Sequence, residues 1–215
     1  LKGKAARQML KELGDKELKG LAFHFVAYKQ FTSNKPIKKL ADMKGIKFRT
    51  MASPMLLAQF KALGANAIPI PFAEVYAALQ QGVAEGQENP YSSILKMRFY
   101  EVQKYLTQSN HGLIVIYNLL SKKWWDKLPV DLQKLVTEVF QEAEPVAWNY
   151  SQSIDREAIK KMKAAGLKFV NIAPGDRAAF RKATANVKNV YIKRVGEHGR
   201  KLLDLIKADI AAFSK

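Results

Sequence analysis

Arg49 is the residue whose type and position point most directly to a binding chemistry. It lies near the end of the run IKFRT, which reads as a short strand, and the following Ser53 and Pro54 are typical of a helix start. Open α/β sheets bind ligands at the carboxyl ends of such strands, and a guanidinium there can hold a carboxylate through two parallel hydrogen bonds. An ordinary surface arginine at a strand end would give the same spacing. The local pattern leaves both interpretations open.

Asn89 and Phe72 are two further candidates for a binding site. Asn89 precedes Pro90, so its side chain is held near a rigid turn with both a donor and an acceptor to offer. An ordinary Asn-Pro turn is the alternative. Phe72 precedes a predicted helix, where it could form the apolar wall of a pocket or pack in the core. Neither local pattern alone separates binding from structure.

Catalytic patterns find little support. No cysteine is present, and no nucleophile, phosphate-loop or dinucleotide motif occurs. The pair Glu85 and Glu88 could in principle serve acid and base roles, but beside glycine and proline such carboxylates are usually solvated or capping groups. We therefore predict a protein that is not an enzyme and needs no metal or cofactor. Three histidines lack any metal spacing and are interpreted as packing or surface residues: His24, His111 and His198.

The strongly basic balance raises a second class of function. Thirty-six Lys and Arg residues against nineteen Asp and Glu give a formal net charge of +17, enough to attract nucleic acid or another polyanion. The lysines are scattered along most of the predicted helices, however, with no arginine-rich arm and no aromatic-basic RNA motif. A solvated basic surface is the preferred interpretation, and a basic nucleic-acid or polyanion-binding domain is the alternative.

The first part of the chain predicts a helix and a buried strand. Residues 4–13 have the spacing of an amphipathic helix and lack the apolar core of a signal peptide. The run 21–28 is rich in aromatic and branched residues, as buried strands are. The longest apolar run, 112–120, contains a Tyr and an Asn and is far shorter than the roughly 18 residues of a membrane span. No transmembrane segment is predicted.

Two strand–helix pairs follow. The strand that carries Arg49 leads into a helix that ends before Gly64, and a strand at 67–71 leads into a helix at 73–81. The segment 83–90 is interpreted as a short connection closed by proline. Two such units in succession favour α/β architecture.

The second half predicts strands around one long helix. Residues 104–109 and 112–121 are expected to form one or two strands, the latter so apolar that it should be buried on both faces. Helical spacing then persists from 128 to 166, with Pro145 as a predicted kink, before a strand at 167–172. Such a helix could span two lobes. The predicted helical tail covers 176–214, with breaks near Gly196 and Gly199.

Several blocks in combination resemble the solute-binding proteins of TRAP transporters, a family that includes dicarboxylate and sialic acid receptors. The blocks are KGIKFR, PFAEVYAALQQGVAEGQENP and RFYEVQKYL. The resemblance continues through QFTSNKPIKKLADMKG and SKKWWDKLPVDLQKLV, so it covers nearly the whole chain. It implies an α/β fold with the two-lobed, class II-like periplasmic-binding-protein architecture, in which a long kinked helix links lobes that close on a ligand.

The same resemblance implies roles for individual residues. Arg49 takes the family's carboxylate-clamping position, Asn89 that of the ligand-contacting asparagine and Phe72 that of the aromatic pocket residue. Lys29 stands where many relatives have a second arginine, so a flexible point charge replaces a bidentate donor. The run GLIVIY is apolar where some relatives have polar contacts, which suggests a less hydroxylated ligand. The implied ligand-binding set is completed by Met51 and Val115.

The resemblance also implies a domain organisation and partners. Residues 27–114 and 156–215 are expected to form the second ligand-binding lobe, and 1–26 and 115–155 to belong to or cross into the first. Family members ordinarily begin with further βα units, so the first lobe is expected to be incomplete here. The implied role is that of a periplasmic, monomeric receptor for a small carboxylate that docks on TRAP permease subunits and binds no nucleic acid.

Overall fold

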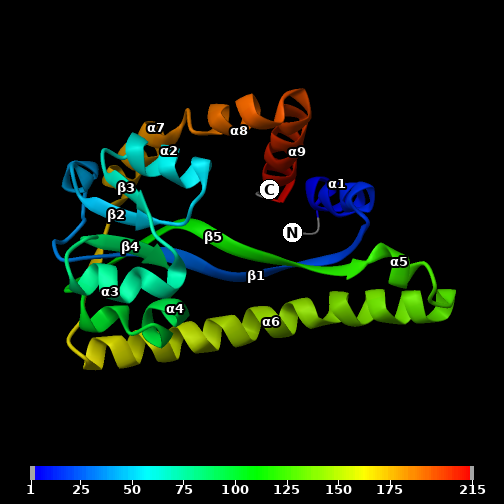
Figure 1. Cartoon of the computed structure of the whole chain (residues 1–215), viewed down its shortest axis with the longest axis horizontal. Coiled ribbons are helices and arrows are strands. Elements are labelled where there is room, and N and C mark those ends of the chain that lie inside the picture. The colour runs from blue at the N-terminus through cyan, green and yellow to red at the C-terminus, as the bar shows by residue number, and fades with distance from the viewer. Residues whose placement is uncertain (1–2, 214–215) are drawn as a thin grey trace. The chain divides into compact units, whose positions relative to one another are not determined.

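The computed structural model describes residues 3–213 and divides them into two compact units. Unit 2 comprises Tyr28–Gly112 and Ile154–Arg194, and the remaining described residues form unit 1. Three long elements contribute residues to both units: strand β1 (Leu18–Ser33), strand β5 (Tyr105–Ser121) and helix α6 (Val130–Ala164) (Figure 1). The predicted division into lobes stays a prediction.

Unit 2 is built on a six-stranded sheet of order β3-β2-β4-β1-β5-β6. Strands β2 (Lys47–Thr50), β3 (Asn66–Pro69) and β4 (Gly86–Asn89) run parallel, β1 is antiparallel to β4, and β6 (Lys168–Asn171) is parallel to β5. The mixed sheet with interleaved helices confirms the α/β class.

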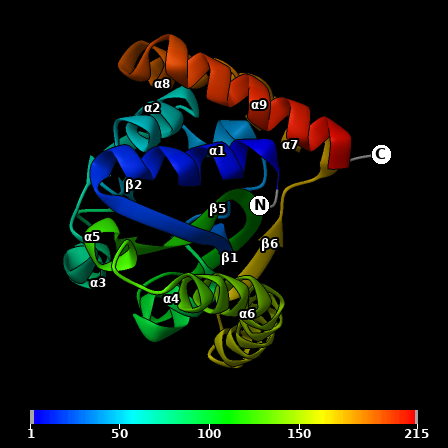
Figure 2. The same cartoon turned by 90° about the vertical axis from the view of Figure 1, so that its right-hand side faces the viewer.

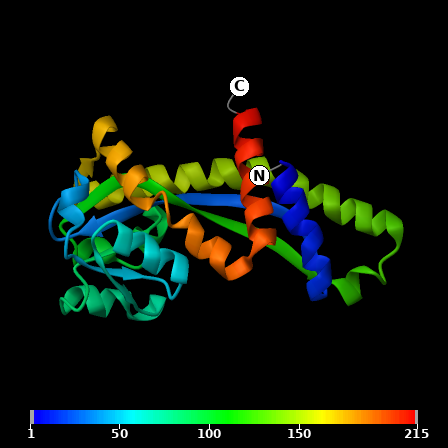
Figure 3. The ribbon, with the colours of Figure 1, turned by 90° about the horizontal axis from the view of Figure 1, so that it is seen from above.

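Helices cover both faces of this sheet. Helices α2 (Pro54–Ala62) and α7 (Pro174–Thr184) are neighbours on one side (Figure 1 and Figure 3). One cluster of fully buried side chains lies under them and includes Phe31, Phe48 and Phe60. The rings of Phe48 and Phe60 stack with centroids 4.5 Å apart, and burying each such side chain stabilises the fold by roughly 1.5–3 kcal/mol.

The opposite face carries a second core. Helices α3 (Val75–Gln80) and α4 (Tyr91–Lys96) pack there with the end of α6, and short 3-10 segments at Phe72–Glu74 and Phe99–Glu101 accompany them. The buried side chains of this cluster include Val75, Ile94, Phe99, Leu106 and Met162. Two cores on one sheet make unit 2 a three-layer structure.

Unit 1 has a much thinner core. Helix α1 (Lys4–Glu12) packs against α9 (Glu197–Phe213) (Figure 2). Short helices at Leu13–Lys16 and Lys122–Trp125 flank the strand residues of this unit. Few of its apolar side chains are buried, and several of those are alanines. The buried ones include Ala5, Ala6, Leu21, Trp125 and Leu202. No helix within residues 3–213 is long and apolar enough to cross a membrane.

Several predicted elements agree with the structure. Helix α2 begins at Pro54 after an extended Ser53 and stops before Gly64, whose φ of +85° is a left-handed conformation that glycine adopts without strain. Helix α6 is a single 35-residue element that continues through Pro145. Gly196, with φ of +76°, separates α8 (Lys188–Val195) from α9, as expected.

Other expectations were wrong. The segment 83–90, read as a connection, contains strand β4. Residues 112–121 are not buried on both faces, since Leu113, Ile116 and Tyr117 are each more than half exposed. Gly199 lies inside α9 and breaks nothing, and residue 214 of the predicted tail lies outside the described range.

Candidate functional site

The site is built where two parallel strands end side by side. In the register of β2 and β4, Phe48 lies opposite Gly86 and Arg49 opposite Gln87. A Cβ at Gly86 would lie 2.8 Å from the Phe48 ring and from the Thr32 carbonyl oxygen, so only glycine permits this approach. The carboxyl ends of β2 and β4 therefore meet at one edge.

Arg49 is buried at this edge without an acidic partner. Only 2% of its surface is exposed, and its Nε donates a 2.9 Å hydrogen bond to the Ile70 carbonyl oxygen. Within residues 3–213 no carboxylate lies at ion-pair distance, and its Nη groups have no hydrogen-bond acceptor. Burial lowers the pKa of the guanidinium, and the charge of Glu88 partly opposes this. The side chain is therefore a desolvated cation whose two Nη groups remain available as hydrogen-bond donors.

Asn89 ends β4 within a chain of amides and hydroxyls. Its Nδ2 donates to Gln87 Oε1 at 2.6 Å, Gln87 Nε2 donates to Thr32 Oγ1 at 2.9 Å, and Thr32 Oγ1 donates to Gln103 Oε1 at 3.0 Å. Because these bonds run in one direction, they fix the amide orientation and leave the Asn89 Oδ1 acceptor free of bonds to described side chains. Asn89 is 8% exposed.

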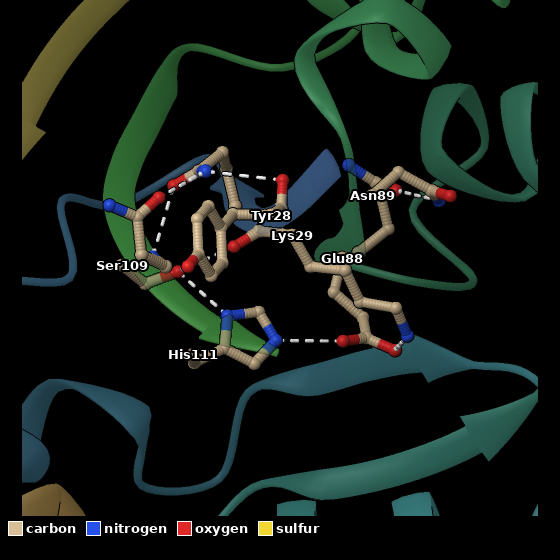
Figure 4. A network of polar contacts seen from close by, with 9 residues as sticks. Tyr28, Lys29, Glu88, Asn89, Ser109 and His111 are labelled. Carbon is tan, nitrogen blue, oxygen red and sulfur yellow. Dashed lines mark hydrogen bonds and ion pairs between the residues drawn. The ribbon is translucent and has the colours of Figure 1, made fainter. Parts of the chain in front are cut away.

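Lys29 belongs to a second buried network, centred on Glu88 (Figure 4). Lys29 Nζ lies 2.6 Å from Glu88 Oε1, and His111 Nε2 lies 2.7 Å from Glu88 Oε2. His111 Nδ1 in turn lies 2.7 Å from Ser109 Oγ, and the imidazole stacks on Phe31 at 4.0 Å. Figure 4 shows Lys29 and His111 meeting the two oxygens of one carboxylate.

The charges in this network follow from its burial. Burial pushes the pKa of Glu88 upward, but His111 and Lys29 together outweigh that effect and hold it below its usual value. Burial lowers the pKa of His111, despite the opposing charge of Glu88. A neutral His111 therefore donates from Nε2 to Glu88 and accepts at Nδ1 from the Ser109 hydroxyl.

The order Ser109, His111, Glu88 is that of a hydrolase triad, yet its charges do not suit such chemistry. A triad needs a carboxylate that is free to stabilise the imidazolium formed when the serine is deprotonated. Lys29 neutralises the carboxylate that would stabilise an imidazolium. The residues that the structure describes contain no cluster of side chains suited to a metal ion. The arrangement is a buried structural network of internally paired groups.

The candidate residues fall into three groups. Arg49, Asn89 and Lys29 lie on neighbouring strands of the sheet, and Phe72 lies beside Arg49, with the guanidinium carbon 5.8 Å from the ring centroid. Phe72 is 43% exposed, so it is not simply a core residue. Met51, 46% exposed, follows β2. Val115 belongs to unit 1 and is half-buried.

Two members of the buried network were not expected from the sequence. Glu88 was interpreted as a solvated or capping carboxylate, which is wrong, since it is 2% exposed and makes two charged contacts. His111 is a packing residue, as predicted, but it also joins this network. Lys29 was the sequence signal that could have revealed this network, because a lysine in an apolar strand needs a buried acid nearby.

Comparison with known proteins gives a family match. The model of the family described as bacterial extracellular solute-binding protein, family 7, matches residues 1–194. The chain is 36% identical over 198 residues to the C4-dicarboxylate-binding periplasmic protein DctP of Vibrio cholerae, covering 92% of this chain and 58% of that protein. It is 35% identical over 214 residues to the 2,3-diketo-L-gulonate-binding periplasmic protein YiaO of Escherichia coli, covering 97% and 62%.

A solved structure agrees with these matches. The TRAP periplasmic solute-binding protein from Desulfovibrio salexigens with bound orotic acid superposes with a TM-score of 0.92 at 39% identity, covering 98% of this chain and 68% of that one. The chain thus spans about three-fifths of the length of the curated relatives it matches. An incomplete two-lobed fold agrees with this coverage.

Proposed function

The chain belongs to family 7 of the bacterial extracellular solute-binding proteins, and from this premise we propose that it binds a small organic acid through Arg49 for a TRAP-type transporter. One observation carries the proposal: Arg49 is a buried cation that forms no ion pair with any acid among the described residues. A desolvated, unpaired charge is costly. A ligand carboxylate would supply the missing partner through two parallel hydrogen bonds.

The residues around Arg49 offer further contacts to a bound organic acid. Asn89 offers an amide acceptor to a hydroxyl or amine of the ligand, and Phe72 offers an exposed aromatic face next to the guanidinium. Lys29 already pairs with Glu88, so its proposed contribution is to keep that carboxylate from competing for Arg49. Contacts from Met51 and Val115 stay predictions.

The proposed ligand class follows from charge. The three relatives are named for, or hold, a C4-dicarboxylate, 2,3-diketo-L-gulonate and orotic acid, all of which are organic acids. We propose the same class for this chain, with TRAP permease subunits as partners and a monomeric state. The extracellular description of the family agrees with the periplasmic location expected from the sequence. The family is one of receptors, so catalysis and the nucleic-acid alternative find no support.

Calorimetric titration of the full chain with a panel of C4-dicarboxylates and sugar acids tests this proposal. Arg49→Ala should weaken binding of the best ligand by about 2–5 kcal/mol, or roughly 30-fold to several thousand-fold. Arg49→Lys should recover only part of it, because an ammonium cannot make the bidentate contact. Arg98→Ala is the control, since Arg98 is exposed and pairs only locally with Glu101. Equal affinity of Arg49→Ala and wild type would refute the assignment.

A further inference from the structure

A cavity lies in unit 2 that none of the candidate ligand residues lines, although His111 in its wall contacts Glu88, the partner of Lys29. It measures about 170 Å³ and is bounded by α2, α7, β5 and the end of β6. Arg49, Asn89 and Phe72 do not line it. Its volume lies below the roughly 300–1,000 Å³ of sites for drug-sized ligands. Only a small molecule can be accommodated.

One end of this cavity is cationic. Arg177 and Arg181 stand one turn apart on α7 and both line it. Arg177 donates from Nη1 to the Ser109 carbonyl oxygen at 2.7 Å and from Nη2 to that of Gln108 at 2.9 Å, so β5 holds it in place. Arg181 makes no ion pair with any residue from 3 to 213, and no acidic side chain lines the cavity.

Like charges at this spacing repel by about 0.2–0.5 kcal/mol on an exposed helix. Arg181 is exposed, so water and salt screen part of this repulsion, and with no acid in the cavity wall a bound anion would relieve more of it. Asn110 adds polar capacity, because its Oδ1 accepts from Gln30 Nε2 while its own Nδ2 has no described partner. The charged end of the cavity therefore has hydrogen-bond donors from Arg181 and Asn110.

The rest of the wall contains the polar residues Gln59, His111 and Thr184 and an apolar part. The side chains of Phe31, Leu63, Ile172 and Phe180 line it. A wholly polar anion such as phosphate would leave this surface uncovered, whereas an aromatic or aliphatic body would bury it at about 25 cal/mol per Å². We propose that this cavity is a second binding site, which takes a small monocarboxylate with an apolar body, its carboxylate on Arg181 and its body against Phe180.

This site shares no lining residue with the one proposed around Arg49, and the test separates the two. Titration of the full chain with benzoate, followed by ¹H–¹⁵N NMR, should give saturable shifts in residues around the cavity, including Ser109 and His111. Arg49→Ala should leave this affinity unchanged. Arg181→Ala should weaken it about tenfold, the loss of one charge-assisted contact of about 1.4 kcal/mol.

Lys182→Ala is the matched control, since Lys182 is exposed like its neighbour Arg181 but does not line the cavity. It should bind benzoate as wild type does, and thermal melts of both α7 variants should verify that each is folded. Loss of binding in Arg49→Ala but not in Arg181→Ala would overturn the proposal. So would the absence of saturable binding at millimolar benzoate, or equally tight binding of inorganic phosphate.

Discussion

Glu88 connects two other largely buried polar side chains of unit 2. Its two oxygens accept from Lys29 and His111, and all three side chains are largely withdrawn from water. A buried ion pair of this kind adds little net stability, but removing one partner leaves an uncompensated charge. The consequences of substitution should therefore depend strongly on which member of the network is changed.

Lys29→Met should destabilise the fold by about 3–5 kcal/mol, because it leaves the Glu88 carboxylate buried with only a neutral imidazole. Urea denaturation at neutral pH measures this loss. Adding Glu88→Gln to Lys29→Met should recover part of it, since the uncompensated charge is then gone. Lys61→Met, at an exposed position on α2, is the control and should change stability by less than about 0.5 kcal/mol. A double variant no more stable than Lys29→Met would contradict the electrostatic explanation.

The same network predicts a loss of stability in acid. The pKa of His111 is lowered in the folded state, so the unfolded chain binds protons more readily once the pH falls below about 6.5. The pKa of Glu88 is also lowered, so its contribution is present above about pH 4.5 and disappears as the pH falls through the folded-state pKa. Both effects have the same sign.

The contribution of this network to the free energy of unfolding should therefore decrease between about pH 7 and pH 5, and the pH slope of His111→Gln should differ from that of wild type by that amount. Urea titrations at several pH values give the slope directly. The control is His198→Gln, at a side chain that is 54% exposed and lies outside this network. An unchanged slope in His111→Gln would mean that the titration belongs to other groups.

At the scale of the elements, Asp155 ties α6 to the start of α4. Its carboxylate accepts a hydrogen bond from the backbone of Ser92, yet burial raises its pKa to about 6. The raised pKa means that this carboxylate costs stability when ionised. The contribution of Asp155 to the free energy of unfolding therefore falls as the pH rises from about 3.8 to 6. This pH dependence is opposite in sign to that of Glu88.

Asp155→Asn should accordingly stabilise the fold at pH values above about 7, by about 1 kcal/mol after allowance for the partial exposure of the side chain. The gain should vanish below about pH 4, where Asp155 is protonated in both states. Thermal or urea unfolding at the two pH values provides the comparison. Glu157→Gln, two residues along the same helix, removes an exposed ion pair with Lys161 and should give no gain. Destabilisation by Asp155→Asn at neutral pH would show that the bond to Ser92 outweighs desolvation.

How much of the fold and site could be predicted from the sequence differs from element to element. Helix α2 could be predicted, because Ser53, Pro54 and Gly64 act locally through backbone conformation. Strand β4 could not, because GQEN contains no strong strand former and is held in the sheet by pairing with β1 and β2 on either side. Arg49 could be singled out by its place near the end of a strand, whereas Glu88 and His111 meet across 23 residues that no local pattern links.

At the scale of the molecule, the two units differ in how much apolar surface they bury. Both large core clusters lie in unit 2. In unit 1 many large apolar side chains of the described residues are exposed, among them Leu113, Ile116, Tyr117, Val139 and Trp148. Since burial of apolar surface is the main source of stability, unit 1 should open more readily than unit 2.

Because β5 and α6 each contribute residues to both units, the stability of the two units can be compared within a single element. Amide hydrogen exchange should be slower at residues 105–109 than at 113–121 of β5, and slower at 154–164 than at 130–153 of α6, since local opening follows local burial. Mass spectrometry of peptides from the exchanged full chain resolves these segments. Equal protection along each element would mean that the two units unfold as one cooperative body, and that the exposed apolar face of unit 1 is covered in solution.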